Sequence, residues 1–217
     1  PQSMAIFFGI SSISKSKVPD IWKQSAQTLL SNHSLHPTTY VTKSSFILWQ
    51  DMKIWGPESS TNTAAGLSII AGNPIYIKNG RCFSHDSALA DLNSSKHDQI
   101  EKFLMLCNGT FCGLHIAPIE DTIYIYSDKL GARPIYWGVQ GDFFYFSTSF
   151  WILEQLDFIT KTPDDIAISE VSAFGFPLGT RSPYKEIKTI FDLRIFSSSM
   201  FSKSTSLIYG VNPPISP

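Results

Sequence analysis

Cysteine and histidine are the residue types in this chain most able to attack a carbonyl or to bind a metal, and their spacing supports neither role. The cysteines Cys82, Cys107 and Cys112 form an odd set in a chain large enough to be stable without cross-links, so we expect reduced thiols. The histidines show no HExxH pattern, and no CxxC pair accompanies them. A zinc site therefore has no support. The five histidines are His33, His36, His85, His97 and His115.

Short runs of β-branched and aromatic residues predict that strands dominate the first part of the chain. The apolar run Ala5 to Ile10 is too short for a helix and predicts a buried, central strand. Apolar residues at helical spacing predict a helix over Ile21 to Leu30, opened by Pro19 and Asp20. Further strands are predicted at Tyr40 to Val41, Phe46 to Trp49, Met52 to Trp55, Leu67 to Ala71 and Ile75 to Ile77, with a turn at 72–74.

The second part of the chain alternates helical and strand patterns. One or two helices are predicted between Ser87 and Cys107, and another after Pro163. Because strands and helices come in separate blocks, we predict an α+β fold with antiparallel sheets, in which two sheets lie between helical layers. The strands predicted here are Gly109 to Ile116, Thr122 to Ser127, Pro134 to Trp137, Phe143 to Ser147, Ile187 to Ile190 and Leu193 to Phe196.

The amino-acid composition and net charge indicate which kinds of partner the chain can bind. The 217 residues are 43% apolar, and 17 basic against 18 acidic side chains leave a net charge of −1, so we expect neither nucleic acid nor membrane as a partner. No apolar run is long enough for a membrane helix and no secretory pattern opens the chain, so we expect a cytoplasmic protein. Residues 1–3 are typical of a cloning remnant, 4–196 of a single domain, and the Ser- and Pro-rich 197–217 of a linker.

Three ordered segments resemble the glutaminase domain of asparagine-synthetase-like enzymes. The segment from Asp128 through Gly131, Pro134 and Tyr136 is similar to the family signature D-x-x-G-x-x-P-L-Y-Y. Gly109 to Leu114 before it resembles the strand G-x-F-A-F, and Phe144 to Ser149 after it resembles L-x-F-A-S-E. The similarity extends from about residue 4 to 195 and implies the four-layer αββα sandwich of the N-terminal-nucleophile hydrolases, of the class II glutamine amidotransferase type.

The same resemblance implies that the reactive group is missing. In this family an N-terminal cysteine attacks the glutamine amide, and its own α-amine is the base. Ala5 stands at that position, and a methyl group has no lone pair, so we predict no catalytic residue. Ser3 precedes the first strand and would fail to couple nucleophile with base.

The residues that grip glutamine in the family also differ. His33 to Pro37 replaces H-R-G-P-D, so the arginine fork for a carboxylate is lost. Ala71-Gly72-Asn73 replaces N-G-E, which removes an oxyanion donor. Asn73 and Asp86 are the remaining candidates for contact with a substrate, and an alternative for Asp86 is a helix N-cap before Ser87.

The signature segment is expected to be structural. Gly131 is expected to supply a backbone conformation that other residues resist, and Arg133 to form an internal ion pair with a residue such as Asp128 rather than to bind a substrate. The neighbouring aromatic residues are expected to form core and interface rather than a stacking platform. They are Trp137, Phe143, Phe144, Tyr145, Phe146, Phe150 and Trp151.

Relatives without the cysteine, such as lasso-peptide cyclases and β-lactam synthetases, close an amide after ATP activation of a carboxylate. We therefore expect an inactive glutaminase-like domain of an ATP-dependent carbon–nitrogen ligase in peptide or natural-product maturation. The S-G-G-x-D-S loop for ATP is absent, so no cofactor is expected here, and ATP and magnesium belong to a synthetase domain supplied in cis or in trans, with a precursor peptide as a further partner. Two alternatives are a stand-alone scaffold that docks a peptide or subunit, and an amidotransferase with an unusual nucleophile.

Overall fold

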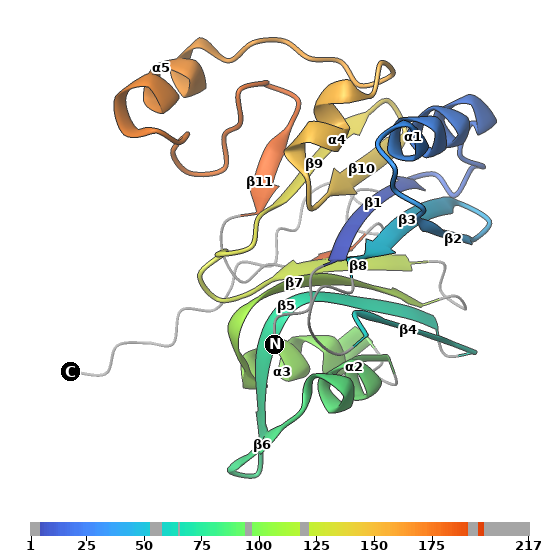
Figure 1. Ribbon diagram of the computed structural model, residues 1–217, viewed down its shortest axis with the longest axis vertical. Coiled ribbons are helices and arrows are strands. Elements are labelled where there is room, and N and C mark those ends of the chain that lie inside the picture. Colours follow the sequence, from blue (N-terminus) through green and yellow to red (C-terminus); the bar gives the residue numbers. More distant parts are fainter. Residues whose placement is uncertain are drawn as a thin grey trace.

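Two antiparallel sheets form the centre of the molecule (Figure 1). The computed structural model describes residues 5–52, 58–64, 66–93, 97–117, 122–190 and 195–197. The first sheet has the order β11-β9-β10-β1-β3-β2. Its strands are β1 (Ala5–Ser12), β2 (Thr38–Val41), β3 (Ser45–Asp51), β9 (Ile135–Gln140), β10 (Phe143–Ser147) and β11 (Lys188–Ile190).

The second sheet has the order β12-β8-β7-β5-β4, with β6 paired to the far end of β5. Its strands are β4 (Ser60–Thr63), β5 (Gly66–Lys78), β6 (Arg81–Phe83), β7 (Cys107–Ala117), β8 (Thr122–Ser127) and β12 (Ile195–Ser197). All described pairings are antiparallel, as the grouping of strands and helices in the sequence predicts.

Helices cover the outer face of each sheet. The first sheet carries α1 (Asp20–Asn32) and α4 (Phe150–Gln155), and the second carries α2 (His85–Asn93) and α3 (His97–Leu106). A further helix, α5 (Asp165–Phe174), lies at the periphery of the molecule (Figure 1). The predicted α+β class and the four-layer αββα sandwich of two antiparallel sheets are confirmed.

Three apolar layers fill the spaces between these four levels. Phe7, Trp49, Leu67 and Leu114 belong to the layer between the sheets. Phe8 and Ile10 point the other way, toward α1 and α4, because successive strand side chains face opposite sides. Ile70 and Tyr126 contribute to the third layer, beneath α2 and α3.

Strand β1 is central, as its apolar run predicts. It pairs with β3 on one side and β10 on the other, and all but Ile6 of its residues are buried. Gly9 is required there, because a Cβ at this position would lie 2.3 Å from the Phe146 ring. The strand therefore fixes the depth at which its first residue, Ala5, lies.

The predicted turn at residues 72–74 is wrong. Leu67–Ala71 and Ile75–Ile77 belong to one strand, β5, which pairs with β7 without interruption from Leu67 to Tyr76. Gly72, at φ +116°, and Pro74 are accommodated within the strand, so cross-strand pairing outweighs two residues that usually mark turns.

Other boundaries show where local patterns fail. Helix α4 and strands β4 and β6 have no counterpart among the predicted elements, since each spans six residues or fewer. The predicted strand Met52 to Trp55 lies largely outside the described residues, as does the predicted linker beyond Ser197. Helix α5 begins as predicted, with the Asp164 carboxylate accepting from the Ile166 and Ala167 amides, and ends at Gly175 with φ +83°.

Candidate functional site

Ala5 is the first residue of β1 and lies between the two sheets. It is 7% exposed, belongs to the apolar layer that contains Phe7 and Trp49, and pairs with Asp51 at the end of β3. Its side chain offers a methyl group to this layer and no heteroatom to a ligand. The position that the family resemblance assigns to the nucleophile is thus buried, beside the polar end of β3.

A groove with a volume of about 330 Å³ opens at this end of β3. Asp51, the partner of Ala5, lines it together with Glu58 and Ser60 from the start of β4. Its described lining contains two carboxylates and no lysine or arginine. The complete set is His36, Thr38, Trp49, Gln50, Asp51, Glu58 and Ser60.

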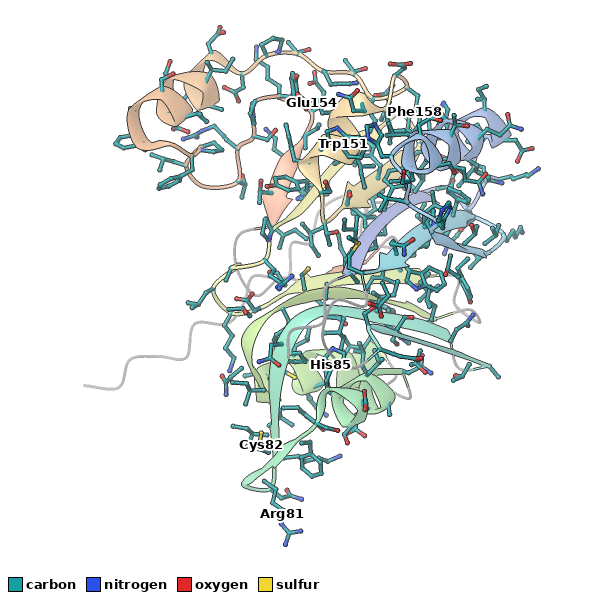
Figure 2. All side chains as sticks on the ribbon, in the orientation of Figure 1. Arg81, Cys82, His85, Trp151, Glu154 and Phe158 are labelled. Carbon is teal, nitrogen blue, oxygen red and sulfur yellow. The ribbon has the colours of Figure 1, made fainter. Side chains whose placement is uncertain are left out.

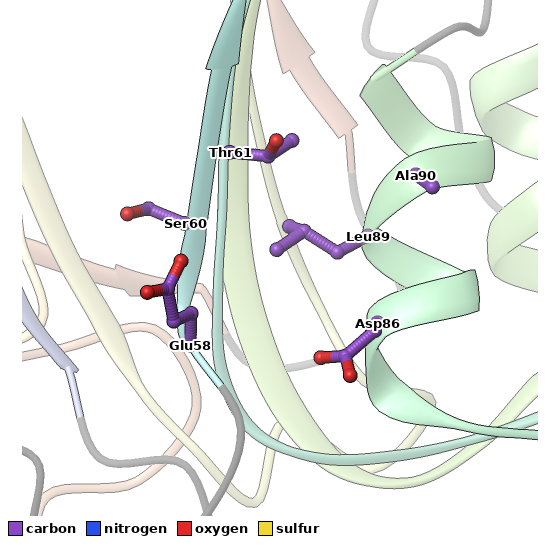
Figure 3. A pocket seen from close by; sticks show the side chains of 6 residues that line it. All are labelled: Glu58, Ser60, Thr61, Asp86, Leu89 and Ala90. Atoms are coloured by element: carbon purple, nitrogen blue, oxygen red, sulfur yellow. The ribbon is translucent and has the colours of Figure 1, made fainter.

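A second groove, of about 290 Å³, lies between β4 and α2 (Figure 3). Glu58 and Ser60 line both grooves, so the start of β4 separates them. In Figure 3, Asp86 and Leu89 reach from α2 toward the strand. The described lining of the second groove is Glu58, Ser60, Thr61, Asp86, Leu89 and Ala90.

Hydrogen bonds join the end of β3 to Ser59 and Ser60 at the start of the second sheet. The Asp51 carboxylate accepts from the Ser59 amide at 2.9 Å and from its hydroxyl at 2.8 Å. The Ser59 carbonyl accepts from the Ile70 amide at 2.8 Å, and the Trp49 indole donates to the Ser60 hydroxyl at 3.1 Å. Asp51 therefore joins the two sheets next to Ala5.

The two histidines of the segment His33 to Pro37, which replaces the family's carboxylate clamp, lie in different places. His36 lines the first groove, and its amide donates to the Gln50 side chain at 3.0 Å. His33 instead contacts the Trp151 ring edge-on, with centroids 4.4 Å apart, at the end of α1. The structure thus brings one of the two histidines to the groove, and neither supplies a bidentate guanidinium.

The two predicted ligand contacts, Asn73 and Asp86, do not meet in one groove. Asp86 lines the second groove, whereas Asn73 is exposed on β5, pairs with Thr110 and lines neither. The alternative that Asp86 is an N-cap is wrong. The helix begins at His85, and the Ser84 hydroxyl accepts from the Ser87 amide at 3.3 Å, which places the cap two residues earlier.

His85 is a feature of this region that the sequence pattern missed. It is the first residue of α2 and is 9% exposed (Figure 2). Neither ring nitrogen has a hydrogen-bond partner in the described part of the chain. Burial lowers the pKa of His85, although Asp86, the Ile70 carbonyl and Asp51 favour the charged ring. The Ile70 carbonyl is near the ring, but its position does not meet the geometry of a hydrogen bond.

The signature segment is built around the buried Asp128 carboxylate. One of its oxygens accepts from the amides of Leu130 at 2.9 Å and Ala132 at 3.2 Å, and the other from those of Phe111 at 3.2 Å and Arg133 at 3.4 Å. Four main-chain donors thus satisfy one side chain, and the main-chain amide of Arg133 is one of them.

Two expectations for the same segment are borne out by its geometry. Gly131 has φ +61°, which L-residues with a side chain resist. Of the neighbouring aromatic residues, Phe144, Tyr145 and Phe146 are buried in the core, whereas Trp137, Phe143, Phe150 and Trp151 are half-buried and pack against it. The Arg133 side chain lies over β5, where a Cβ on Gly72 would come within 2.8 Å of its Nε.

The described cysteines offer no activated thiol. Cys112 shares the layer between the sheets with Ala5, and burial raises its pKa to about 12. Burial likewise raises the pKa of Cys107 to about 12. Cys82 is exposed on the β5–β6 hairpin, at the far end of the molecule from α5 (Figures 1 and 2).

No helix among the described residues has the length and apolar character needed to cross a membrane. No cluster of three or more His, Cys, Asp or Glu in the part of the chain that the structure describes has the arrangement of a metal site.

Among known proteins, only solved structures are similar to this chain. No protein-family model and no curated protein matches the chain. One similar structure is the glutamine phosphoribosylpyrophosphate amidotransferase from B. subtilis complexed with ADP and GMP, with 13% identity over 90% of this chain and a TM-score of 0.49. Another is described as the allosteric regulatory enzyme of purine biosynthesis, with 14% identity over 70% and a TM-score of 0.48. The chain spans 49% and 43% of their lengths.

Proposed function

We propose that this chain is a glutaminase-type sandwich domain that has lost amide hydrolysis and belongs to an asparagine-synthetase-like, ATP-dependent amide-forming enzyme. The observation that carries the proposal is Ala5, which begins the central strand, is buried beside Asp51 and has no atom able to attack glutamine. The proposed setting is peptide or natural-product maturation, as in lasso-peptide cyclases, and the proposed location is the cytoplasm.

The charge of the grooves supports the loss of glutamine binding. Asp51, Glu58 and Asp86 line them, and the described lining contains no lysine or arginine. Glutamine carries a carboxylate, which needs a cationic partner to leave water. A groove lined by carboxylates would repel it, so the loss of the clamp agrees with the loss of the nucleophile.

The state of the cysteines argues against a substitute nucleophile. The thiolate is the reactive form of cysteine, and a pKa of about 12 for Cys112 leaves almost none of it at neutral pH. Cys112 also lies within a strand, so its amine is part of a peptide bond and is no base. An amidotransferase with an unusual cysteine is therefore the weaker proposal.

The chain needs a second unit under this proposal. Its sequence contains no S-G-G-x-D-S loop, so ATP and magnesium would be bound by a synthetase unit, in cis or in trans. A precursor peptide is the proposed further partner. The sandwich would then act by docking.

Release of glutamate from glutamine tests the proposal. The purified 217-residue chain should release glutamate at the rate of a buffer blank, because nucleophile and clamp are both absent. A chain that begins at position 5 and carries Ala5→Cys should also stay at background, since restoring the thiol does not restore carboxylate binding. Glutamate release by the unaltered chain that disappears in Cys112→Ser would contradict the proposal and favour the unusual nucleophile.

A further inference from the structure

The chain contains two asparagine–glycine steps, Asn79-Gly80 and Asn108-Gly109. At such a step the main-chain nitrogen of the glycine can attack the side-chain amide of the asparagine, because glycine has no Cβ to shield its nitrogen. Both steps are exposed to solvent, so neither sequence nor exposure separates them. Their places in the two-sheet fold do.

The first step forms the tip of the β5–β6 hairpin (Figure 1). Asn79 and Gly80 have φ of +51° and +73°, and Lys78 pairs with Arg81 on either side, which defines a two-residue type I′ turn. In such a turn the amide of the fourth residue closes the hairpin, so the amide of Gly80 is not needed for it. A Cβ at Gly80 would have no described atom within 4 Å, so the space around this nitrogen is open.

The second step lies within a strand. Asn108 and Gly109 belong to β7 and pair with β5. The Asn108 side chain accepts a hydrogen bond from the Lys129 ammonium at 2.9 Å. A Cβ at Gly109 would lie 2.3 Å from the Asn73 carbonyl, so the main chain of β5 packs directly against this glycine. Asn108 is therefore held, and its reaction requires this end of β7 to open.

We propose that Asn79 is a site of self-modification, at which the main chain converts the side-chain amide to a carboxylate. The Gly80 nitrogen bonds to the Cγ of Asn79, the bond from Cγ to the side-chain nitrogen breaks, and the Gly80 proton passes through solvent to the ammonia that leaves. Water then opens the cyclic imide at either carbonyl. Opening at one carbonyl gives aspartate, and opening at the other gives isoaspartate, whose main chain is longer by one methylene.

Both products change the tip of the hairpin. Each adds a negative charge to the turn between Lys78 and Arg81. Isoaspartate also lengthens a turn whose length fixes the register of β5 with β6, and only three residue pairs hold that register. The pairing of β5 with β7 ends at Tyr76, before the turn. The modification is therefore expected to loosen β6 and to leave the sandwich intact.

Peptide mapping of the folded 217-residue chain tests this proposal. The chain is incubated at neutral pH and digested with pepsin in acid, where the attacking nitrogen keeps its proton, and the peptides that contain Asn79 and Asn108 are followed by chromatography and mass spectrometry. We expect Asn79 to convert at least about ten times faster than Asn108, because Asn108 must first leave a paired strand. Equal rates, or faster conversion at Asn108, would overturn the proposal.

The same measurement in urea separates the effect of the fold from that of the sequence. In the unfolded chain each asparagine is followed by an unhindered glycine, so the two peptides should convert at similar rates. A tenfold difference that persists in urea would show that the turn does not select Asn79. Conversion of Asn79 in urea alone would show that the turn protects it. Either result contradicts the proposal.

Paired substitutions provide a readout on the intact chain. Isoelectric focusing should show a more acidic species that accumulates with time in the unaltered chain. Asn79→Gln should prevent its formation, because the longer side chain would have to close a larger ring. Asn108→Gln is the matched control and should form the acidic species as fast as the unaltered chain. Accumulation that is unchanged in Asn79→Gln would place the conversion at another residue.

Discussion

Two regions of the molecule differ in how their buried polar groups are hydrogen-bonded: the signature segment at Asp128, and the groove region around Asp51 and His85. In the first, four main-chain amides satisfy one buried carboxylate. In the second, a buried imidazole has no hydrogen-bond partner among the described residues, and the lining carboxylates face open grooves. A buried polar group without a partner costs stability, so the His85 ring is a polar group that the fold itself does not need, in contrast to the Asp128 carboxylate.

Asp128→Ala would give the largest effect, because it removes the acceptor of four amides at a buried site. We expect the free energy of unfolding to fall by about 3 to 4 kcal/mol, measured by urea denaturation. Asp165→Asn, at an exposed position in the first turn of α5, is the control and should change it by less than about 0.5 kcal/mol. A loss below about 1 kcal/mol for Asp128→Ala would remove the contrast between the two regions.

Asp51→Ala should have the next largest effect. It removes the acceptor for the Ser59 amide and hydroxyl, and with it a link between the sheets beside Ala5. We expect a loss of about 2 kcal/mol in urea denaturation, smaller than for Asp128 because fewer donors are left unpaired. Ser59→Ala, which removes one of the two bonds, should lose about half as much. Equal losses for Asp51→Ala and Asp128→Ala would mean that the groove region is as fully structural as the signature segment.

His85→Leu should not lower the stability of the chain, although most substitutions of buried residues do. An apolar side chain of similar size has no unpaired nitrogen, so we expect the variant to be as stable as the unaltered chain, or about 1 kcal/mol more stable, at pH 7.5. His85→Ala, which leaves a cavity, is the control and should be less stable. A loss of more than about 2 kcal/mol for His85→Leu would show that the imidazole is satisfied in solution.

The same residue predicts a pH dependence. Because burial lowers the pKa of His85 in the folded chain, the neutral ring is favoured by folding, and this contribution is complete above the unfolded value of about 6.5. It is lost as the pH falls from there toward the folded pKa. Between pH 7.5 and 5.5 the unaltered chain should therefore lose more stability than His85→Leu, by at most about 1.4 kcal/mol per pH unit. Parallel pH profiles for the two proteins would contradict this.

Ser84→Ala should cost about 1 kcal/mol, because the hydroxyl of Ser84 caps α2. Asp86→Asn keeps the helix and changes a groove charge, so we expect a loss below about 0.5 kcal/mol. Thermal unfolding of the two variants side by side separates capping from lining. A larger loss for Asp86→Asn than for Ser84→Ala would indicate that Asp86, and not Ser84, is the N-cap of α2.

The fold was predictable where periodic patterns were long. The run at Ala5 to Ile10 identified the central strand, and the order of strands and helices identified two antiparallel sheets between helices. Gly72 and Pro74 misled the prediction, because β7 pairs with β5 across both and cross-strand pairing is not a local property. The six-residue helix α4 was missed, since it is held by packing against the first sheet.

The candidate site was predictable only in part. Ala5 and Asp86 were identified from their places in ordered motifs, and Asp86 does line a groove. Asn73, chosen in the same way, lines neither groove. Asp51, Glu58 and His85 stand in no motif, and they meet because β3, β4 and α2 come together at one end of the sandwich.

By itself the sequence determined the residue types: an apolar first strand that opens with alanine, a turn that needs glycine at position 131, and a helix from 165 to 174 whose apolar residues outnumber its charged ones. Only the tertiary structure decided which of these are buried and which are exposed. The reason is physical: alternation along a strand or a helix gives the relative facing of side chains, whereas burial depends on which other element, distant in sequence, covers that face.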